Sequence, residues 1–181
     1  MRHFALSAVG RDRPGIVAAV SEVLLRHLVN IEDSQMTILR GHFTMVLVLA
    51  VPDDTDAAGL DADLAQARQR LDLEALSLTE LEETGAPAEA APSHIVTVYG
   101  ADHPGIVHAV TAALAERGAN ITDLSTRLAG EEGEERPVYV LMMEIELPGE
   151  LSIDEVEGAL RRVVDEQQLE LSVHPLERDM L

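Results

Sequence analysis

The sequence predicts an α+β protein made of two ferredoxin-like units, each with the order βαββαβ and an antiparallel sheet. The first observation is an internal repeat: GRDRPGIVAAV at residues 10–20 returns as GADHPGIVHAV at residues 100–110. With a constant offset of 90, the match runs without a gap from 10–33 to 100–123. The second observation is that strand-like and helix-like segments follow in the same order after each copy. A repeat this long is typical of two small domains, because solenoid repeats span only about 20–50 residues.

In the first copy, residues 3–9 alternate apolar and polar side chains, which predicts a strand with one buried face. Pro14 then opens a helix, since proline tolerates the first helical turn. Its buried face is formed by Ile16, Val20, Val23, Leu24 and His27. The other predicted elements are strand 35–40, a tight connection at Gly41-His42, strand 43–51 ended by Pro52, helix 60–71 and strand 73–81.

Residues 84–93 (TGAPAEAAPS) predict a linker, because glycine, alanine, proline and serine cannot supply a core face. The predicted domains are therefore 1–83 and 94–181. In the second copy we expect strand 94–99, helix 104–117, strands 121–129 and 137–147, helix 152–167 and strand 169–176. Its longer hairpin, AGEEGEER at 129–136, is expected to be exposed.

The helices of such a unit lie on one face of the sheet, and the other face needs a cover. Apolar residues on both sides of the third strands, 43–51 and 137–147, predict that a second copy packs there or extends the sheet. The chain has only four aromatic residues, so the cores must be built from Val, Ile, Leu, Met and Ala.

The charge balance excludes several classes of function. The chain has 13 basic and 33 acidic residues, a net charge of −20, so it cannot neutralise many phosphates of DNA or RNA. The same charge disfavours an anionic membrane, and it is typical of a highly soluble protein. An RNA-recognition sheet is also excluded, because the central strands lack stacking aromatic and basic residues.

Two further absences narrow the class of protein. The sequence contains no cysteine, which removes disulfides, thiolate metal sites and cysteine nucleophiles. The first residues, MRHFALSAVG, begin directly with a strand pattern and contain no apolar run that suits a signal peptide or a membrane span. We therefore expect a cytoplasmic protein.

The pattern G-x-D-x-P-G joins the end of a strand to the start of a helix in both copies. A helix start presents free N–H groups and partial positive charge, which attract a carboxylate. Gly15 and Gly105 allow the backbone to approach a ligand, and Asp12 and Asp102 could accept hydrogen bonds from an ammonium group. The turn could thus hold both ends of a free amino acid. Alternatively, the aspartates cap their own helices and the glycines only relieve crowding between helix and strand.

A second shared pattern, N-I-x-D, occurs at 30–33 and 120–123. Asparagine tolerates left-handed backbone, so this pattern could be turn chemistry alone. Gly118 is expected to end the preceding helix in the second copy. Leu28 stands at that position in the first copy, so the turn there must either differ or be strained.

These residues resemble ACT domains: GRDRPGIV at 10–17 and GADHPGIV at 100–107 are each followed by an Asn-Ile turn. The resemblance covers nearly the whole chain, and two ACT domains without a catalytic domain resemble the glycine cleavage system transcriptional repressor family. It implies a sensor that binds an amino acid or a related small effector at an interface between two domains and acts through a protein partner. Carried over by position, it points to ligand-binding residues Asp12, Arg13, Gly15, Ile16, Asn30, Asp102, His103, Gly105, Ile106 and Asn120. We also expect a homodimer.

The two copies differ within the proposed turn, because Arg13 corresponds to His103. The two sites therefore need not bind the same ligand. His103 could be a pH-sensitive or metal-binding group, or a solvated histidine of a loop.

No enzyme signature occurs in the chain. The seven histidines form no H-E-x-x-H or similar ligand spacing, and neither a P-loop nor a Gly-x-Ser-x-Gly elbow is present. We predict no catalytic residue, no metal ligand and no cofactor. Two alternatives to the sensor remain, namely an acidic protein-interaction module without a ligand and a regulatory subunit of an amino-acid metabolic enzyme.

Overall fold

Strands and helices follow one another in the same order in both halves of the chain. The computed structural model describes residues 1–82, 91–129, 138–149 and 151–176, and the chain divides into two compact units, Met1–Ala86 (unit 1) and Pro87–Leu181 (unit 2). Unit 1 contains β1 (Arg2–Arg11), α1 (Ile16–Arg26), β2 (Asn30–Leu39), β3 (His42–Val51), α2 (Ala57–Arg70) and β4 (Leu73–Leu81). Unit 2 contains β5 (His94–Ala101), α3 (Ile106–Ala115), β6 (Asn120–Ala129), β7 (Val138–Glu146), α4 (Ile153–Glu166) and β8 (Glu170–Pro175). The predicted α+β, ferredoxin-like order is confirmed in both units.

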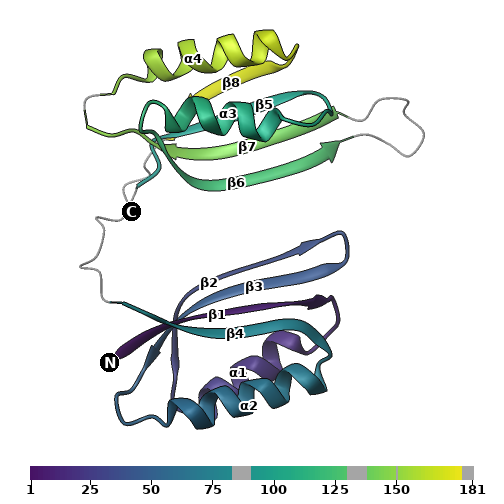
Figure 1. Ribbon diagram of the computed structural model, residues 1–181, viewed down its shortest axis with the longest axis vertical. Coiled ribbons are helices and arrows are strands. Elements are labelled where there is room, and N and C mark those ends of the chain that lie inside the picture. Colours follow the sequence, from purple (N-terminus) through teal and green to yellow (C-terminus); the bar gives the residue numbers. More distant parts are fainter. Residues whose placement is uncertain (83–90, 130–137, 150, 177–181) are drawn as a thin grey trace. The chain divides into compact units, whose positions relative to one another are not determined.

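Each unit is a four-stranded antiparallel sheet whose two helices cover the same face (Figure 1). The strand order is β2-β3-β1-β4 in unit 1 and β6-β7-β5-β8 in unit 2. The first strand of each unit is therefore central, and β2 and β6 lie at an edge. This order places the turn after β1 and after β5 at the middle of one sheet end.

The core of each unit lies between the sheet and its helices. Every second residue of the central strands is buried there and meets the apolar stripes of the helices. In unit 1 these residues include Phe4, Leu6, Met45, Leu47, Leu49, Val20, Leu24, Leu60 and Leu64. In unit 2 they include Val96, Val98, Leu141, Met143, Ile145, Val110, Leu114, Val156 and Leu160.

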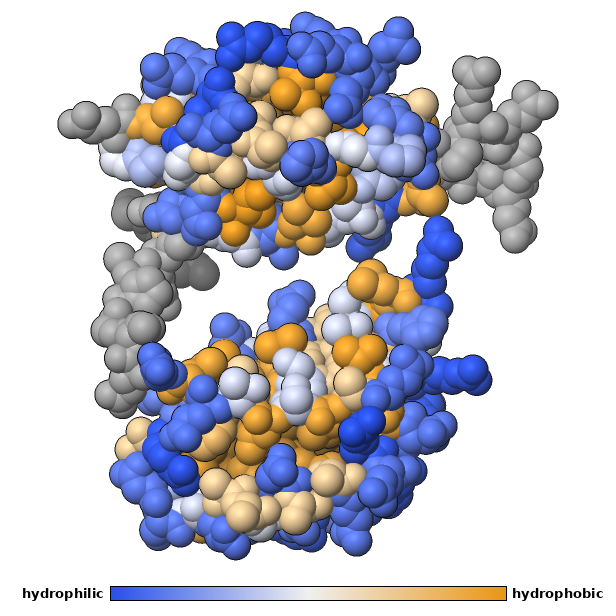
Figure 2. Space-filling model, in the orientation of Figure 1, coloured by the Kyte–Doolittle hydropathy of each residue, from blue (hydrophilic) through white to orange (hydrophobic). Residues whose placement is uncertain are grey.

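The helices leave the opposite face of each sheet uncovered within its own unit (Figure 1). Val46 on β3 and Met142 on β7 point to this face and remain exposed within their units. Orange, hydrophobic residues interrupt the blue surface of both units in Figure 2. The predicted cover for this face stays a prediction.

Both helices of unit 1 begin at other residues than the sequence predicts. Pro14 does not open α1, because Gly15 adopts a left-handed conformation and the helix starts only at Ile16. The next helix starts at Ala57 rather than at residue 60, because the side chain of Asp56 accepts a hydrogen bond from the Ala58 N–H at 3.1 Å. A polar side chain before the helix thus extends it by satisfying one of its free N–H groups.

Strand β2 is longer than its sequence indicates. It begins at Asn30 rather than at residue 35, with a bulge between Ile31 and Asp33. Every residue of this edge strand is exposed. Its first half shows no apolar alternation because it contains the polar run Glu32-Asp33-Ser34-Gln35. The following turn consists of Arg40 and Gly41, both with positive φ, as two-residue hairpin turns prefer. The predicted Gly41-His42 connection is therefore wrong by one residue, since His42 already belongs to β3.

Two predicted segments fall largely outside the described residues. They are the linker at 84–93, of which residues 84–90 are not described, and the hairpin at 129–136, of which residues 130–136 are not described. Of the helices that the structure describes, none combines the length and the apolar character that crossing a bilayer requires.

Candidate functional site

The turn before each first helix places a left-handed glycine directly at the helix start. Gly15 has φ 96° and ψ −5°, and Gly105 has φ 104° and ψ −12°. A Cβ atom added to either glycine would find no other described atom within 4 Å. The backbone conformation therefore requires glycine here, and the crowding explanation is wrong for this pair.

The helix start beside each glycine presents free amide groups. The first intrahelical bonds run from the Ala19 N–H to the Gly15 carbonyl and from the Ala109 N–H to the Gly105 carbonyl, both at 2.9 Å. The N–H groups that precede these bonds have no partner within their helix, as at every helix start. Open space above the glycine and free N–H groups beside it make this turn a place where an anion can approach the backbone.

The first glycine of the same motif, Gly10 or Gly100, is constrained by packing and not by its backbone conformation. A Cβ atom on Gly10 would lie 2.7 Å from Leu73 Cδ2 and 3.1 Å from Leu73 Cα. On Gly100 it would lie 2.6 Å from Leu169 Cδ2. Leu73 begins β4 and Leu169 directly precedes β8, and both leucines are buried, so a side chain on Gly10 or Gly100 would force a core leucine to shift.

The aspartates of the motif do not cap the helices. The helix-start residues are Gly15 and Gly105, and no side chain caps either helix. Among the described residues, no hydrogen bond reaches the carboxylate of Asp12 or Asp102, and both residues are exposed. The Asp12 N–H is held by the Gly41 carbonyl at 3.0 Å, which fixes the turn against the neighbouring hairpin. Both carboxylates are therefore available to a ligand.

The remaining residues of the turn differ in exposure. Arg13 is exposed, and His103 lies beside its own backbone, with Nδ1 3.2 Å from the Pro104 carbonyl. The side chains of Ile16 and Ile106 are buried in the core, so only their main-chain N–H groups can face a ligand. The ligand-binding role of all these residues stays a prediction.

The structure does not bring Asn30 and Asn120 to the turns of their own units. Asn30 pairs with Ala50, which pairs with His3, whereas Gly10 stands seven residues further along β1. At about 3.3 Å per residue, Asn30 lies roughly 23 Å from the turn, at the opposite end of the sheet. Asn120 starts β6 at the corresponding end of unit 2, where its Nδ2 is 3.5 Å from Glu146 Oε2. A single unit therefore cannot bring its own turn and its own asparagine to one small ligand.

Sequence reasoning missed an apolar groove beside the turn of unit 1. It lies between α1 and β2 on the helix-covered face and has a volume of about 240 Å³. Its lining is mostly apolar, with two serines: Val17, Val20, Ser21, Ile31, Ser34, Met36, Met45 and Leu47. The only sequence signal is the set of apolar residues on β2, and these become a groove only once the register aligns them with α1.

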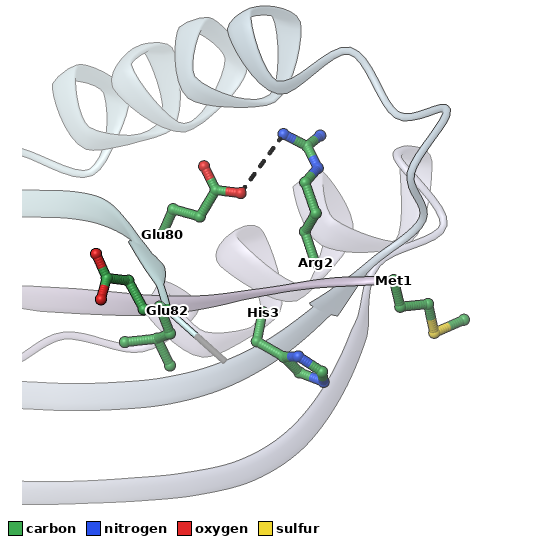
Figure 3. Close-up of a pocket in the computed structure, with 6 residues that line it drawn as sticks. Met1, Arg2, His3, Glu80 and Glu82 are labelled. Atoms are coloured by element: carbon green, nitrogen blue, oxygen red, sulfur yellow. Dashed lines mark ion pairs between the residues drawn. The ribbon is translucent and has the colours of Figure 1, made fainter. Parts of the chain in front are cut away.

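A second, polar hollow lies at the opposite end of unit 1, where β1 begins and β4 ends (Figure 3). Arg2 Nη1 is 3.9 Å from Glu80 Oε1, and His3 Nε2 is 3.3 Å from Glu32 Oε2. None of the predicted ligand-binding residues lines it.

Two carboxylate contacts perturb a pKa, one between α1 and α2 and the other on β5 directly before Gly100. A hydrogen bond with His27, whose Nε2 is 3.0 Å from Asp63 Oδ2, holds the pKa of Asp63 below its usual value. The carboxylate of Glu170 raises the pKa of Tyr99 through a side-chain hydrogen bond and through its charge. In the part of the chain that the structure covers, no three His, Asp or Glu side chains group as a metal site would require.

Comparison with known proteins agrees with this architecture. The ACT domain family model matches residues 2–76 and again residues 94–174. The chain is 24% identical over 173 residues to the glycine cleavage system transcriptional repressor of Escherichia coli, covering 95% of this chain and 89% of that protein. It is 36% identical to a UPF0237 protein of Methanopyrus kandleri over 77 residues, 42% of this chain and 86% of that protein. A crystal structure of an unknown protein from Galdieria sulphuraria superposes with a TM-score of 0.79 at 28% identity, covering 97% and 99% of the two chains.

Proposed function

Since this chain belongs to the ACT domain family, we propose that it is a regulatory protein that binds a free amino acid or a related small effector. The observation that carries the proposal is the open, left-handed glycine turn at a helix start, which occurs once in each unit. The free N–H groups after Gly15 and Gly105 receive the carboxylate of the ligand. The carboxylates of Asp12 and Asp102 receive its ammonium group.

The flanking residues adjust each site. Arg13 and His103 stand at the same position of the two turns, so one turn carries a guanidinium group where the other carries an imidazole. The two turns can therefore prefer different effectors.

Asn30 and Asn120 enter the sites of a partner molecule in a homodimer. Each asparagine lies at the end of its sheet that is remote from its own turn, so an antiparallel neighbour can bring it to a turn of the other chain. A ligand held across such an interface binds one arrangement of the two molecules more tightly than another, so it stabilises that arrangement. The change of arrangement is the signal.

The signal passes to a protein partner rather than to DNA. A chain with a net charge of −20 repels a phosphate backbone, whereas an acidic surface can dock on a protein of opposite charge. Because the Escherichia coli relative is named a transcriptional repressor of the glycine cleavage system, we propose transcriptional control of amino-acid or glycine metabolism for this chain.

Thermal unfolding against the twenty amino acids tests the proposal. A ligand at one hundred times its Kd stabilises the protein by about 2.7 kcal/mol, which raises the Tm of a small domain by several degrees. The double variant Asp12→Asn/Asp102→Asn should lose this shift without losing stability in the absence of ligand, because neither carboxylate has a partner among the described residues.

Asp61→Asn is the matched control, since it removes one exposed charge on α2, away from the turns. An unchanged ligand shift in the double variant would show that the site lies elsewhere. If no amino acid shifts the unfolding of the wild-type protein, the interaction module without a ligand replaces the sensor.

A further inference from the structure

The groove between α1 and β2 leaves apolar side chains of unit 1 accessible to solvent. Val17 is 47% exposed, Ile31 39% and Met36 48%, whereas the floor residues Val20, Met45 and Leu47 are buried. Among the residues that the structure describes, no charged side chain lines the groove. Its surface can therefore gain from burying a small apolar group, and it would reject a charged one.

The groove begins where the glycine turn ends. Val17 lies in the first turn of α1, two residues after Gly15. On the sheet, Met36 pairs with Met45, which pairs with Ala8, two residues before Gly10. A molecule whose charged groups occupy the turn would thus extend its side chain along the groove.

The corresponding positions of unit 2 carry different side chains and pack differently. Val107 and Ile121, the counterparts of Val17 and Ile31, pack against the core of their unit. The register places Leu124 where unit 1 has Ser34, because these residues pair with Met143 and Leu47 at equivalent points of the third strands. Replacement of a serine by a leucine at this edge adds the side chain that would occupy the groove.

We infer that the groove of unit 1 selects the side chain of the effector and favours an aliphatic amino acid, such as leucine, isoleucine, valine or methionine, over glycine. The inference rests on the proposed function, since the turn must hold the carboxylate and the ammonium group. A volume of about 240 Å³ suits such a side chain, because sites for drug-sized ligands enclose about 300–1,000 Å³. The zwitterionic head meets the charged end of the site and the apolar tail meets its uncharged end.

The expected preference follows from the buried carbon atoms. Each buried methylene adds about a factor of four in affinity. Leucine has three more carbon atoms than alanine, so partial burial in this open groove predicts a preference of at least about 10-fold.

The test is titration calorimetry of leucine, alanine and glycine with the full chain and with Ser34→Leu. This variant copies Leu124 of unit 2 and should fill the groove, so leucine affinity falls at least about 10-fold while glycine affinity changes less than about two-fold. Gln69→Leu is the control, because it adds the same side chain at an exposed position of α2 that does not line the groove. It should leave all three affinities unchanged.

A second variant keeps the test valid if Ser34→Leu fails to fold. Met36→Thr copies Thr126 of unit 2 and removes one wall of the groove, so leucine affinity falls and glycine affinity does not. Glycine binding as tightly as leucine, or a leucine affinity that survives in both variants, overturns the inference and leaves the proposed function standing. If no amino acid binds the wild-type chain, the proposed function fails and the inference fails with it.

Discussion

Leu28 and Gly118 occupy the same left-handed position behind the first helix of their units, with φ 56° and φ 73°. In both turns the next amide closes on the helix, from the Val29 N–H to the Leu24 carbonyl at 3.0 Å and from the Ala119 N–H to the Leu114 carbonyl at 3.1 Å. The two turns are therefore alike, and of the two explanations that the sequence allows for Leu28, strain is correct. For a residue with a Cβ atom, this backbone conformation is less stable by about 1–2 kcal/mol.

Leu28→Gly should raise the free energy of unfolding by about 1 kcal/mol. Relief of the backbone strain stabilises the folded state by more than the extra conformational entropy of glycine stabilises the unfolded state. Little packing is lost, because Leu28 is 77% exposed. Urea denaturation measures the change. The reverse substitution, Gly118→Leu, should lower the stability by about 1–2 kcal/mol, and equal effects of the same sign from both variants would contradict the explanation.

Gly10→Ala should destabilise the protein by about 1–3 kcal/mol, because its Cβ would lie 2.7 Å from Leu73 Cδ2 and 3.1 Å from Leu73 Cα. The matched control is Gly158→Ala in α4, where the added Cβ meets no described atom within 4 Å. This control should raise the helix stability by about 0.5–1 kcal/mol. Thermal unfolding of both variants checks the pair, and a Gly10→Ala variant as stable as the wild type would show that β4 moves aside freely.

Asp63→Asn should make the protein less sensitive to acid. The hydrogen bond with His27 holds the pKa of Asp63 below its usual value, with a smaller contribution from Arg26, whose Nη1 is 3.7 Å from Asp63 Oδ2. A carboxyl group with a depressed pKa in the folded state stabilises the fold above its unfolded pKa of about 3.9, and this stabilisation is lost as the pH falls through the folded pKa.

The unfolding midpoint of the wild type should therefore fall more steeply than that of Asp63→Asn below about pH 4, while Asp61→Asn follows the wild type. Parallel curves for the wild type and Asp63→Asn would show that the contact between α1 and α2 does not matter for acid stability.

Much of this molecule follows from local sequence patterns. The repeat at 10–20 and 100–110 and the alternation of apolar residues predict the order of the helices and strands that the structure describes. The reason is that buried strands and amphipathic helices need a regular apolar face. In unit 2 the strand 121–129 is predicted within one residue of β6 (Asn120–Ala129). In unit 1 the equivalent strand is half missed, because the polar run Glu32-Asp33-Ser34-Gln35 breaks the apolar alternation that Leu124 keeps in unit 2.

The backbone conformation of the two glycine turns also follows from the local sequence, whereas the packing around these turns does not. Glycine at 15 and 105 follows from a backbone conformation that only a few neighbouring residues set. The need for glycine at 10 and 100 arises from Leu73 and Leu169, which lie far along the chain and reach the turn only through strand pairing.

The sequence by itself therefore determined the fold class, the order of the elements and the identity of the two turns. Only the tertiary structure decided that Asn30 lies at the far end of the sheet from Gly15, and that Val17, Ser34 and Met36 line one groove. The reason is physical: helix and strand periodicity are properties of a short segment, but distances between segments depend on the register of hydrogen bonds between strands and on where the helices pack.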